Sequence, residues 1–431
     1  MHGNDAMFEP GASASFKDTS PYLARSLNKA MSMDYTPYPA ALGGDVTWNA
    51  LESVKAKVSD RVALANRFNK IQVCVGVDGY VDSLYSLVSR RDGVENFEIM
   101  RSMSEFGKKV VDTAGSSCNV ERVLKKHIGG GFGPNIARAL GTLGARIDLI
   151  GCVGKPDDVF TSSLPSTINY HSLSEPGATC ALEFNDGKVM LTDFGPVNNV
   201  TWDLIKKKIG RERLIDMFSK ADAIGQGHWA LVPHLNEIWA AWIDEVFPSL
   251  DAKERIFFVD PADMSKRSTT HLMAMMKQLE AINQVKGMKV ILSLNDKEAI
   301  QLSRAFSHAG EIRRFEDYYL AGARMMETLN IHALVIHHPH FATISTKQST
   351  WHVKEGYTTK PRFTTAAGDH FNGGALIALA SGLFTPDEAM ILANACTAYF
   401  VRTGISPDIE KLGTFIDKYR SYVDADLDAI I

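Results

Sequence analysis

Short apolar runs alternate with amphipathic segments of helical length through most of this 431-residue chain. The strand-like runs lie at 71–77, 147–153, 221–225, 256–260, 289–294 and 333–337. Helical patterns lie between several of them, at 232–247, 269–284, 296–306 and 315–329. Short buried strands joined by helices of this length are typical of parallel βαβ units. We therefore expect an α/β fold with a mainly parallel central sheet and helices on both of its faces.

Two segments depart from this alternation. The stretch 180–194 has two β-like arms around Asp186-Gly187, a strong hairpin signal, and predicts a small appended antiparallel sheet. Before the first strand, apolar residues recur at helical spacing over 48–69 and predict one amphipathic helix. Residues 1–45 are rich in Gly, Ser, Pro and Ala and read as an extended or partly ordered arm.

Charge and cysteine usage exclude several classes of protein. The net charge is −4 and the pI about 6.4, so a polyanionic partner such as nucleic acid is not expected. The five cysteines are scattered with no C-x-x-C pair, which predicts reduced thiols in a cytoplasmic protein. The N-terminus lacks the pattern of a signal peptide, and no apolar run is long enough to span a membrane. The expected ligands are small molecules.

The segment TTAAGDHFNGG, residues 364–374, carries the chemistry. Ala366, Ala367 and Gly368 are small residues before Asp369, and a helical pattern follows. Free backbone N–H groups at a helix start, together with the helix dipole, form a site for a phosphate. A carboxylate there would repel the phosphate, unless it accepts a proton from a hydroxyl that attacks the phosphorus. The alternative is that Asp369 only caps the helix.

This segment resembles the second signature of the ribokinase-like (PfkB) carbohydrate kinase family, whose core is Gly-Ala-Gly-Asp followed by Phe-x-x-Gly. Here the match is 366–369, Ala-Ala-Gly-Asp, followed by Phe371-Asn372-Gly373-Gly374. The resemblance implies that Asp369 is the catalytic base and that the amides before it form an anion hole. The family's first Gly is Ala366 here, which costs stability if the position needs a positive φ.

The run 129–158 resembles the first signature of the same family, through Gly130-Gly131 and Asn135. In that family the Gly-Gly pair and the Asn lie in the sugar pocket, and an Asp after the first strand holds sugar hydroxyls. Asp78 matches that Asp. Asp82 is either a further member of the pocket or a solvated turn residue.

Further motifs concern the phosphoryl donor. Asn295-x-x-Glu298 resembles the family element that organises Mg²⁺ and phosphate, although a helix capping box fits the same residues. The strand that in the family ends in a nucleotide-contacting Thr-or-Lys-x-Gly ends here in His337-His338-Pro339, and His338 is the candidate contact. The resemblance also implies that the helix holding Asn394 lies beside the adenine, and that Ser406 lies where relatives hold a monovalent cation such as K⁺.

The resemblance implies a three-layer α/β/α sandwich with a small β-lid formed near 81–110 and 178–195. The expected domains are an arm and helix at 1–70 and a kinase domain at 71–431. The implied activity is transfer of the γ-phosphate of ATP, with Mg²⁺, to a hydroxyl of a sugar or sugar-like molecule, by a protein that is a homodimer. The alternatives are a nucleoside kinase, an ADP-dependent sugar kinase, and a non-catalytic sugar or nucleotide sensor.

Overall fold

The computed structural model describes residues 42–155, 158–306, 310–425 and 427–430. The described residues belong to one compact unit, 40–431. The arm expected at 1–45 lies almost entirely outside the described residues.

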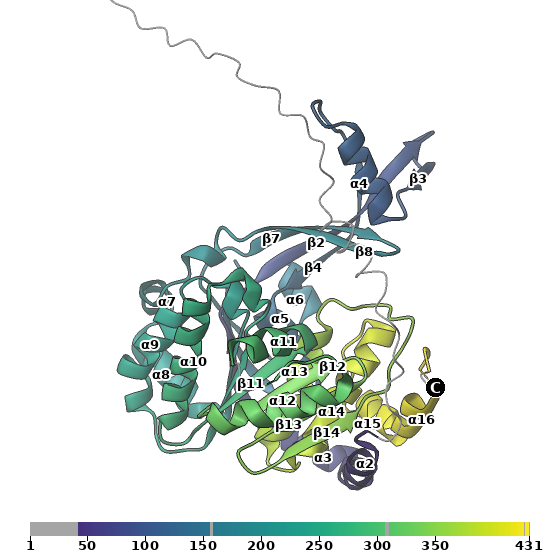
Figure 1. Ribbon diagram of the computed structural model, residues 1–431. Coiled ribbons are helices and arrows are strands. Elements are labelled where there is room, and N and C mark those ends of the chain that lie inside the picture. The colour runs from purple at the N-terminus through teal and green to yellow at the C-terminus, as the bar shows by residue number, and fades with distance from the viewer. Residues whose placement is uncertain (1–41, 156–157, 307–309, 426, 431) are drawn as a thin grey trace, which may run out of the picture. The chain divides into compact units, whose positions relative to one another are not determined.

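A nine-stranded sheet forms the centre of the unit (Figure 1), in the order β14-β13-β12-β11-β10-β9-β1-β5-β6. Its strands are β1 Gln72–Gly76, β5 Arg146–Gly151, β6 Ile168–Ser172, β9 Ala223–Gly227, β10 Arg255–Asp260, β11 Met288–Asn295, β12 Ala333–His338, β13 Phe341–Ser345 and β14 Thr350–Lys354. All neighbouring strands are parallel except at one edge, where β13 runs antiparallel to both β12 and β14. Strands buried on both faces need near-continuous apolar sequence, and this is why β1, β5 and β9 to β12 could be predicted. The strands β6, β13 and β14 were not predicted.

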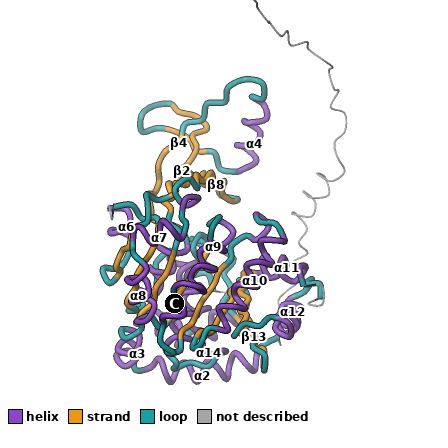
Figure 2. The backbone as a smooth tube through the Cα atoms, turned by 90° about the vertical axis from the view of Figure 1, so that its left-hand side faces the viewer, coloured by secondary structure: helices purple, strands orange, loops and turns teal. Residues whose placement is uncertain are grey.

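Helices cover both faces of the sheet (Figure 2), which gives the predicted three-layer sandwich. One face carries α2 Gly44–Ser59, α5 Phe132–Thr142, α13 Ala367–Ser381, α14 Pro386–Thr403 and α15 Ile409–Asp417. The other face carries α8 Arg211–Lys220, α9 Leu235–Glu245, α10 Thr269–Gln284, α11 Asp296–Ala305 and α12 Phe315–Thr328. The shorter helices are α3 Arg61–Phe68, α6 Asp158–Ser163, α7 Trp202–Lys208 and α16 Tyr419–Ala425.

The single helix expected over 48–69 is wrong, because the chain forms two helices, α2 and α3. Asp60 ends α2 with a non-helical backbone (φ −86°, ψ 86°), and its side chain accepts a hydrogen bond from the Ala63 amide at the start of α3. Both helices bury apolar side chains in the main core, among them Leu51, Val58 and Phe68. They therefore belong with the sheet, and the compact unit does not begin at the expected boundary near residue 70.

A second sheet of five strands forms the lid. Its members are β2 Tyr80–Arg91, β3 Phe97–Ile99, β4 Arg122–Gly130, β7 Gly177–Phe184 and β8 Gly187–Asp193. The predicted hairpin is confirmed as the antiparallel pair of β7 and β8, with Phe184 opposite Gly187. Strand β4 pairs with β2 and was not expected from the sequence. The helix α4 Met103–Asp112 lies with β3 at the outer end of this sheet (Figure 1).

Candidate active site

The start of α13 has the geometry of an anion site. Ala366 precedes the helix with a left-handed backbone (φ 68°, ψ 9°), and no side chain caps the first turn. The first helical bond runs from the His370 amide to the Ala366 carbonyl, and the Ala367 amide lies 3.3 Å from the Thr364 carbonyl. The amides of Gly368 and Asp369 precede that first helical bond and so have no intrahelical acceptor. Two free N–H groups at the positive end of a helix dipole favour a bound anion.

Asp369 lies in this first turn and is buried. The Asn135 side-chain amide donates a hydrogen bond of 2.9 Å to its Oδ2, and Arg138 fixes that amide by donating to its oxygen at 3.0 Å. Burial raises the pKa of Asp369, and together with the charges of Asp260 and Asp78, which raise it, and of His228, which lowers it, gives a value of about 7. A carboxyl group whose pKa lies near neutral pH is suited to accept a proton from a hydroxyl. A residue that only caps a helix does not need such a pKa.

A polar link fixes α13 against the sheet. The Asn372 side chain donates to Asp260 at the end of β10 (2.7 Å) and accepts from the Ser293 hydroxyl on β11 (2.7 Å). Asn372 is fully buried, so the link sets the position of Asp369 relative to the carboxyl ends of the strands. These ends form the edge at which open α/β sheets bind ligands.

Asp78 is fully buried and does not line the cavity beside Asn135. Its carboxylate accepts hydrogen bonds from the amides of Phe132 (2.9 Å) and Gly133 (2.8 Å) at the start of α5, and from His228 Nδ1 (2.7 Å). Asp78 therefore caps a helix and orients a histidine, which differs from the sugar-hydroxyl contact implied by the resemblance.

Asp82 lines the cavity instead. It lies in strand β2, buried, so it is not a solvated turn residue. Its carboxylate packs on Gly130, where an added Cβ would lie 2.1 Å from Oδ2. The next residue, Gly131, has a φ of 98°, which residues with a side chain rarely adopt. The Gly-Gly pair is thus needed for close approach of the backbone to Asp82 and for the turn into α5.

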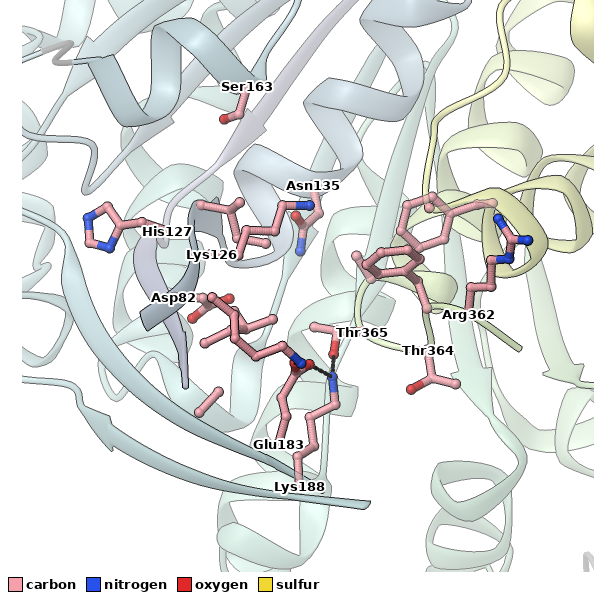
Figure 3. Close-up of a pocket in the computed structure, with 18 of the residues that line it drawn as sticks. Asp82, Lys126, His127, Asn135, Ser163, Glu183, Lys188, Arg362, Thr364 and Thr365 are labelled. Carbon is pink, nitrogen blue, oxygen red and sulfur yellow. Dashed lines mark hydrogen bonds and ion pairs between the residues drawn. The ribbon is translucent and has the colours of Figure 1, made fainter. Parts of the chain in front are cut away.

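The cavity has a volume of about 960 Å³ and lies between the lid and the loop before α13 (Figure 3). Asp82 and Asn135 line it beside residues of the lid and the loop before α13. Lys188 of β8 donates to the Thr365 hydroxyl at 2.6 Å and lies 3.8 Å from Glu183, so the lid contacts the loop directly. A hydroxylated small molecule in this space would lie between polar groups of the lid and Asn135, the partner of Asp369.

Asn295 and Glu298 form a capping box at the start of α11. The Asn295 oxygen accepts from the Glu298 amide, and Glu298 accepts from the Asn295 amide and side chain. Burial, followed by the negative charge of Asp260, raises the pKa of Glu298 to about 8. Two buried carboxylates that disfavour each other's charge fit a nearby cation. Among the described residues, no group of three His, Cys, Asp or Glu side chains is placed to hold a metal ion.

The two histidines at the end of β12 have different surroundings. The His338 ring packs among aromatic rings, 5.4 Å from Phe315 and 4.8 Å from Phe341, and its Nδ1 accepts from the His340 amide. His337 stacks on Phe371 (4.7 Å), and its ring lies within van der Waals distance of the position a Gly368 side chain would take. His337, which was not singled out in the sequence, therefore lies nearer to the anion site than the predicted His338.

Asn394 and Ser406 make contacts within the protein, although the buried Asn394 side-chain oxygen has no hydrogen-bond partner. Asn394 is fully buried in α14, where its side chain donates to the Lys354 carbonyl, so it presents no exposed atom to a nucleotide. The Ser406 hydroxyl pairs with His370 Nε2 at 2.7 Å. Next to it Phe363 packs on Gly404. Aromatic rings and an engaged hydroxyl do not fit a monovalent cation.

Comparisons with known proteins show the family of this chain. The family model described as prokaryotic ketohexokinase matches residues 50–419. A ketohexokinase of Haloferax volcanii is 30% identical over 376 residues, which cover 86% of this chain and 98% of that protein. The chain belongs to the prokaryotic ketohexokinase family. It is a carbohydrate kinase, a phosphotransferase that acts on a sugar hydroxyl.

Solved structures place this family member in the ribokinase-like fold. The ribokinase of Thermotoga maritima has a TM-score of 0.54 at 19% identity and covers 80% of this chain and 99% of its own. The ribokinase of Arabidopsis thaliana complexed with ribose and ATP has a TM-score of 0.55 at 15% identity, with coverage of 80% and 98%. No helix among the described residues is long and apolar enough to cross a bilayer.

One feature of the site could not be seen in the motifs. Three non-glycine residues of the described chain have a positive φ, namely His228, Ala262 and Ala366. All three border the same edge of the sheet, after β9, after β10 and before α13. Residues in this conformation cluster at functional sites, where the surrounding structure enforces them. Only Ala366 was suspected from the sequence. His228 carries no motif, and its pairing with Asp78 depends on the fold.

Proposed function

We propose that this family member transfers the γ-phosphate of ATP to a hydroxyl of a ketohexose, with Asp369 as the general base. The observation that carries the proposal is the buried Asp369 carboxylate, which lies beside two free helix amides and is bonded to Asn135 at the cavity. The ketohexokinase of Haloferax volcanii supports the acceptor class, and the ATP complex of the Arabidopsis ribokinase supports the donor.

Each residue then has a defined part in the transfer. The acceptor lies in the cavity against Asp82 and Asn135, and Asp369 accepts the proton of its reacting hydroxyl. The resulting oxygen attacks the γ-phosphorus in line with the leaving ADP. The Gly368 and Asp369 amides donate to the phosphoryl oxygens and stabilise their growing charge. Burial lowers the pKa of His337 to about 4, so it is neutral and can donate one hydrogen bond to the same group.

Mg²⁺ fits the acidic groups on the donor side. Glu298 would hold it through water, with Asp260 nearby, and the ion would neutralise charge on the phosphates of the donor. Asn295 keeps the Glu298 carboxylate oriented through the capping box.

The proposal is tested by measuring acceptor-dependent transfer with ATP and with ADP as donors. Fructose, other ketohexoses, aldohexoses, ribose and adenosine serve as acceptors, and ³¹P NMR of the product identifies the esterified hydroxyl. The expected result is the highest kcat/KM for a ketohexose with ATP. A preference for adenosine as acceptor would contradict the ketohexose assignment. A preference for ADP as donor would contradict the assignment of ATP.

We also propose that the protein is a homodimer assembled through the lid. The lid exposes large apolar side chains that do not line the cavity, including Leu124 (52% exposed) and Leu191 (57% exposed). Apolar side chains gathered on one small sheet are typical of an interaction surface.

A further inference from the structure

The residue after β9 has an unusual backbone. His228 has φ 55° and ψ 38°, a left-handed conformation that is uncommon for residues other than Gly, Asn and Asp. Gly227 before it leaves no room for a side chain, because an added Cβ would lie 1.9 Å from the Phe132 ring. After it, the Arg267 guanidinium donates to the carbonyls of Trp229 and Val232, among others. The chain therefore holds His228 in place from both sides.

The orientation of the His228 ring is set by Asp78. His228 Nδ1 lies 2.7 Å from Asp78 Oδ2, and the carboxylate is fully buried. The Phe132 amide is 3.3 Å from the same ring nitrogen but 2.9 Å from the carboxylate, so Asp78 is its acceptor and Nδ1 is free to donate. The His228 side chain is 22% exposed, and its Nε2 is not among the buried polar atoms that lack a partner. A histidine paired in this way with a buried carboxylate favours its protonated form.

The groups around His228 are mostly acidic. Burial alone would lower the pKa of His228, but Asp78, followed by Asp369 and Asp260, raises it to about 9. In turn, the charge of His228 lowers the pKa of Asp369, against the effect of burial. The charged groups on the surrounding elements are Asp78 after β1, Asp82 on β2, Arg138 on α5, Lys188 on β8, Asp260 on β10, Arg267 before α10, Glu298 on α11 and Asp369 on α13.

Asp78 also accepts hydrogen bonds from the amides at the start of α5, and Asn135 of that helix donates to Asp369, so His228 is joined to Asp369 through Asp78 and α5. This arrangement indicates a part for His228 in the reaction, given that Asp369 is the base. We propose that His228, oriented by Asp78, is a positively charged positioning residue that keeps the Asp369 carboxylate ionised and so able to accept the proton of the acceptor hydroxyl. It acts through Asp369 and forms no bond to the reacting atoms. A purely structural histidine would stabilise the loop without changing the pH dependence of turnover.

The kinetic test compares the wild type with His228→Asn across pH 5.5–9.5. Asn tolerates the left-handed backbone and removes the charge. The acid limb of kcat/KM should move to higher pH by about one unit, because loss of a nearby opposite charge raises the pKa of a carboxyl group. The loss of kcat/KM should then be about tenfold greater at pH 6 than at pH 9. His228→Lys should restore part of the wild-type profile.

The control is His234→Asn, at the start of α9 on the same loop, which should leave the acid limb in place. An acid limb that does not move in His228→Asn, or a loss of equal size at every pH, overturns the inference.

A second readout does not depend on turnover. NMR of the intact protein labelled at histidine Cε1 should show His228 protonated at pH 7 and titrating near pH 9, with the signal assigned by its absence in His228→Asn. Titration below pH 7 would overturn the inference whatever the kinetics show. If instead Asp369→Asn retained activity, the assignment of the base would fail, and the protonation state of His228 would still be measured separately.

Discussion

At the scale of single residues, the burial of Asp369 determines how the reaction depends on pH. Its pKa is raised to about 7, and only the ionised carboxylate can accept the proton. As the pH falls through 7 the base becomes protonated, so kcat/KM should fall tenfold per pH unit below about 7 and level off above it. A pH series with a ketohexose acceptor measures this limb. A limb near pH 4 would mean that the base is an unperturbed carboxyl group.

Ala366 gives a prediction about stability. A φ of 68° costs conformational free energy for a residue with a Cβ, whereas glycine adopts it without this cost. Ala366→Gly should therefore raise the free energy of unfolding by about 0.5–1 kcal/mol, although glycine makes the unfolded chain more flexible. Ala380→Gly, in the last turn of the same helix, is the control and should lower the free energy of unfolding instead. Denaturant titration measures both, and a destabilised Ala366→Gly would contradict the account.

The motifs predicted which residue types gather at the site but not the contacts of each one. Asn135 and Asp369 were expected near each other, and the structure joins them by a hydrogen bond. Asp78 and Asp82 are four residues apart, and the sequence could not show that the first would cap α5 while the second would line the cavity. His228 depends on a contact across 150 residues, for which no local signal exists.

At the scale of elements, two glycines allow α13 to pack closely against two other helices, α5 and α14. An added Cβ would lie 2.7 Å from Ala139 of α5 at Gly373, and 2.9 Å from Ala393 of α14 at Gly374. Gly374→Ala should lower the free energy of unfolding by about 1–3 kcal/mol, because the close-packed helices must separate.

The matched control is Gly107→Ala in α4, where nothing lies within 4 Å. Helix propensity alone should stabilise that variant by up to about 1 kcal/mol. Equal effects of the two substitutions, measured by chemical denaturation, would contradict the close packing of α13.

The inner strands could be predicted because burial on both faces requires a continuous apolar run. The long helices could be predicted because burial along one stripe requires apolar residues at helical spacing. The helix α10 was predicted with its observed bounds. The break between α2 and α3 was missed, because apolar spacing continues across Asp60 and its capping role depends on a backbone turn. Strand β4 was missed because most of its residues are exposed or polar, so its sequence lacks the alternation of a half-buried strand.

At the scale of the whole molecule, α2 and α3 should unfold together with the sheet. Phe68 is fully buried in the main core, whereas Val62 in the same helix is 71% exposed. Phe68→Ala should cost about 3–5 kcal/mol of stability, and Val62→Ala should change it by less than about 0.5 kcal/mol. Fluorescence and circular dichroism should report one shared transition. A Phe68→Ala protein of normal stability would show that the two helices are peripheral.

Assembly through the lid is tested by light scattering after size-exclusion chromatography. The proposed dimer should dissociate when Leu124 and Leu191 are both replaced by Lys, because each would place a charge in an apolar contact. Lys208→Glu, outside the lid, serves as the control for a change of charge. A wild type that is monomeric at micromolar concentration would contradict the proposed dimer.

The most direct test of the central claim is the turnover of Asp369→Asn. Asparagine keeps the shape of the side chain but cannot accept the proton, so kcat should fall by at least about 10³-fold. Binding of ATP and of the ketohexose, measured by calorimetry, and the melting temperature should stay close to those of the wild type. A variant that binds both ligands and retains kcat within tenfold of the wild type would contradict the assignment of Asp369 as the base.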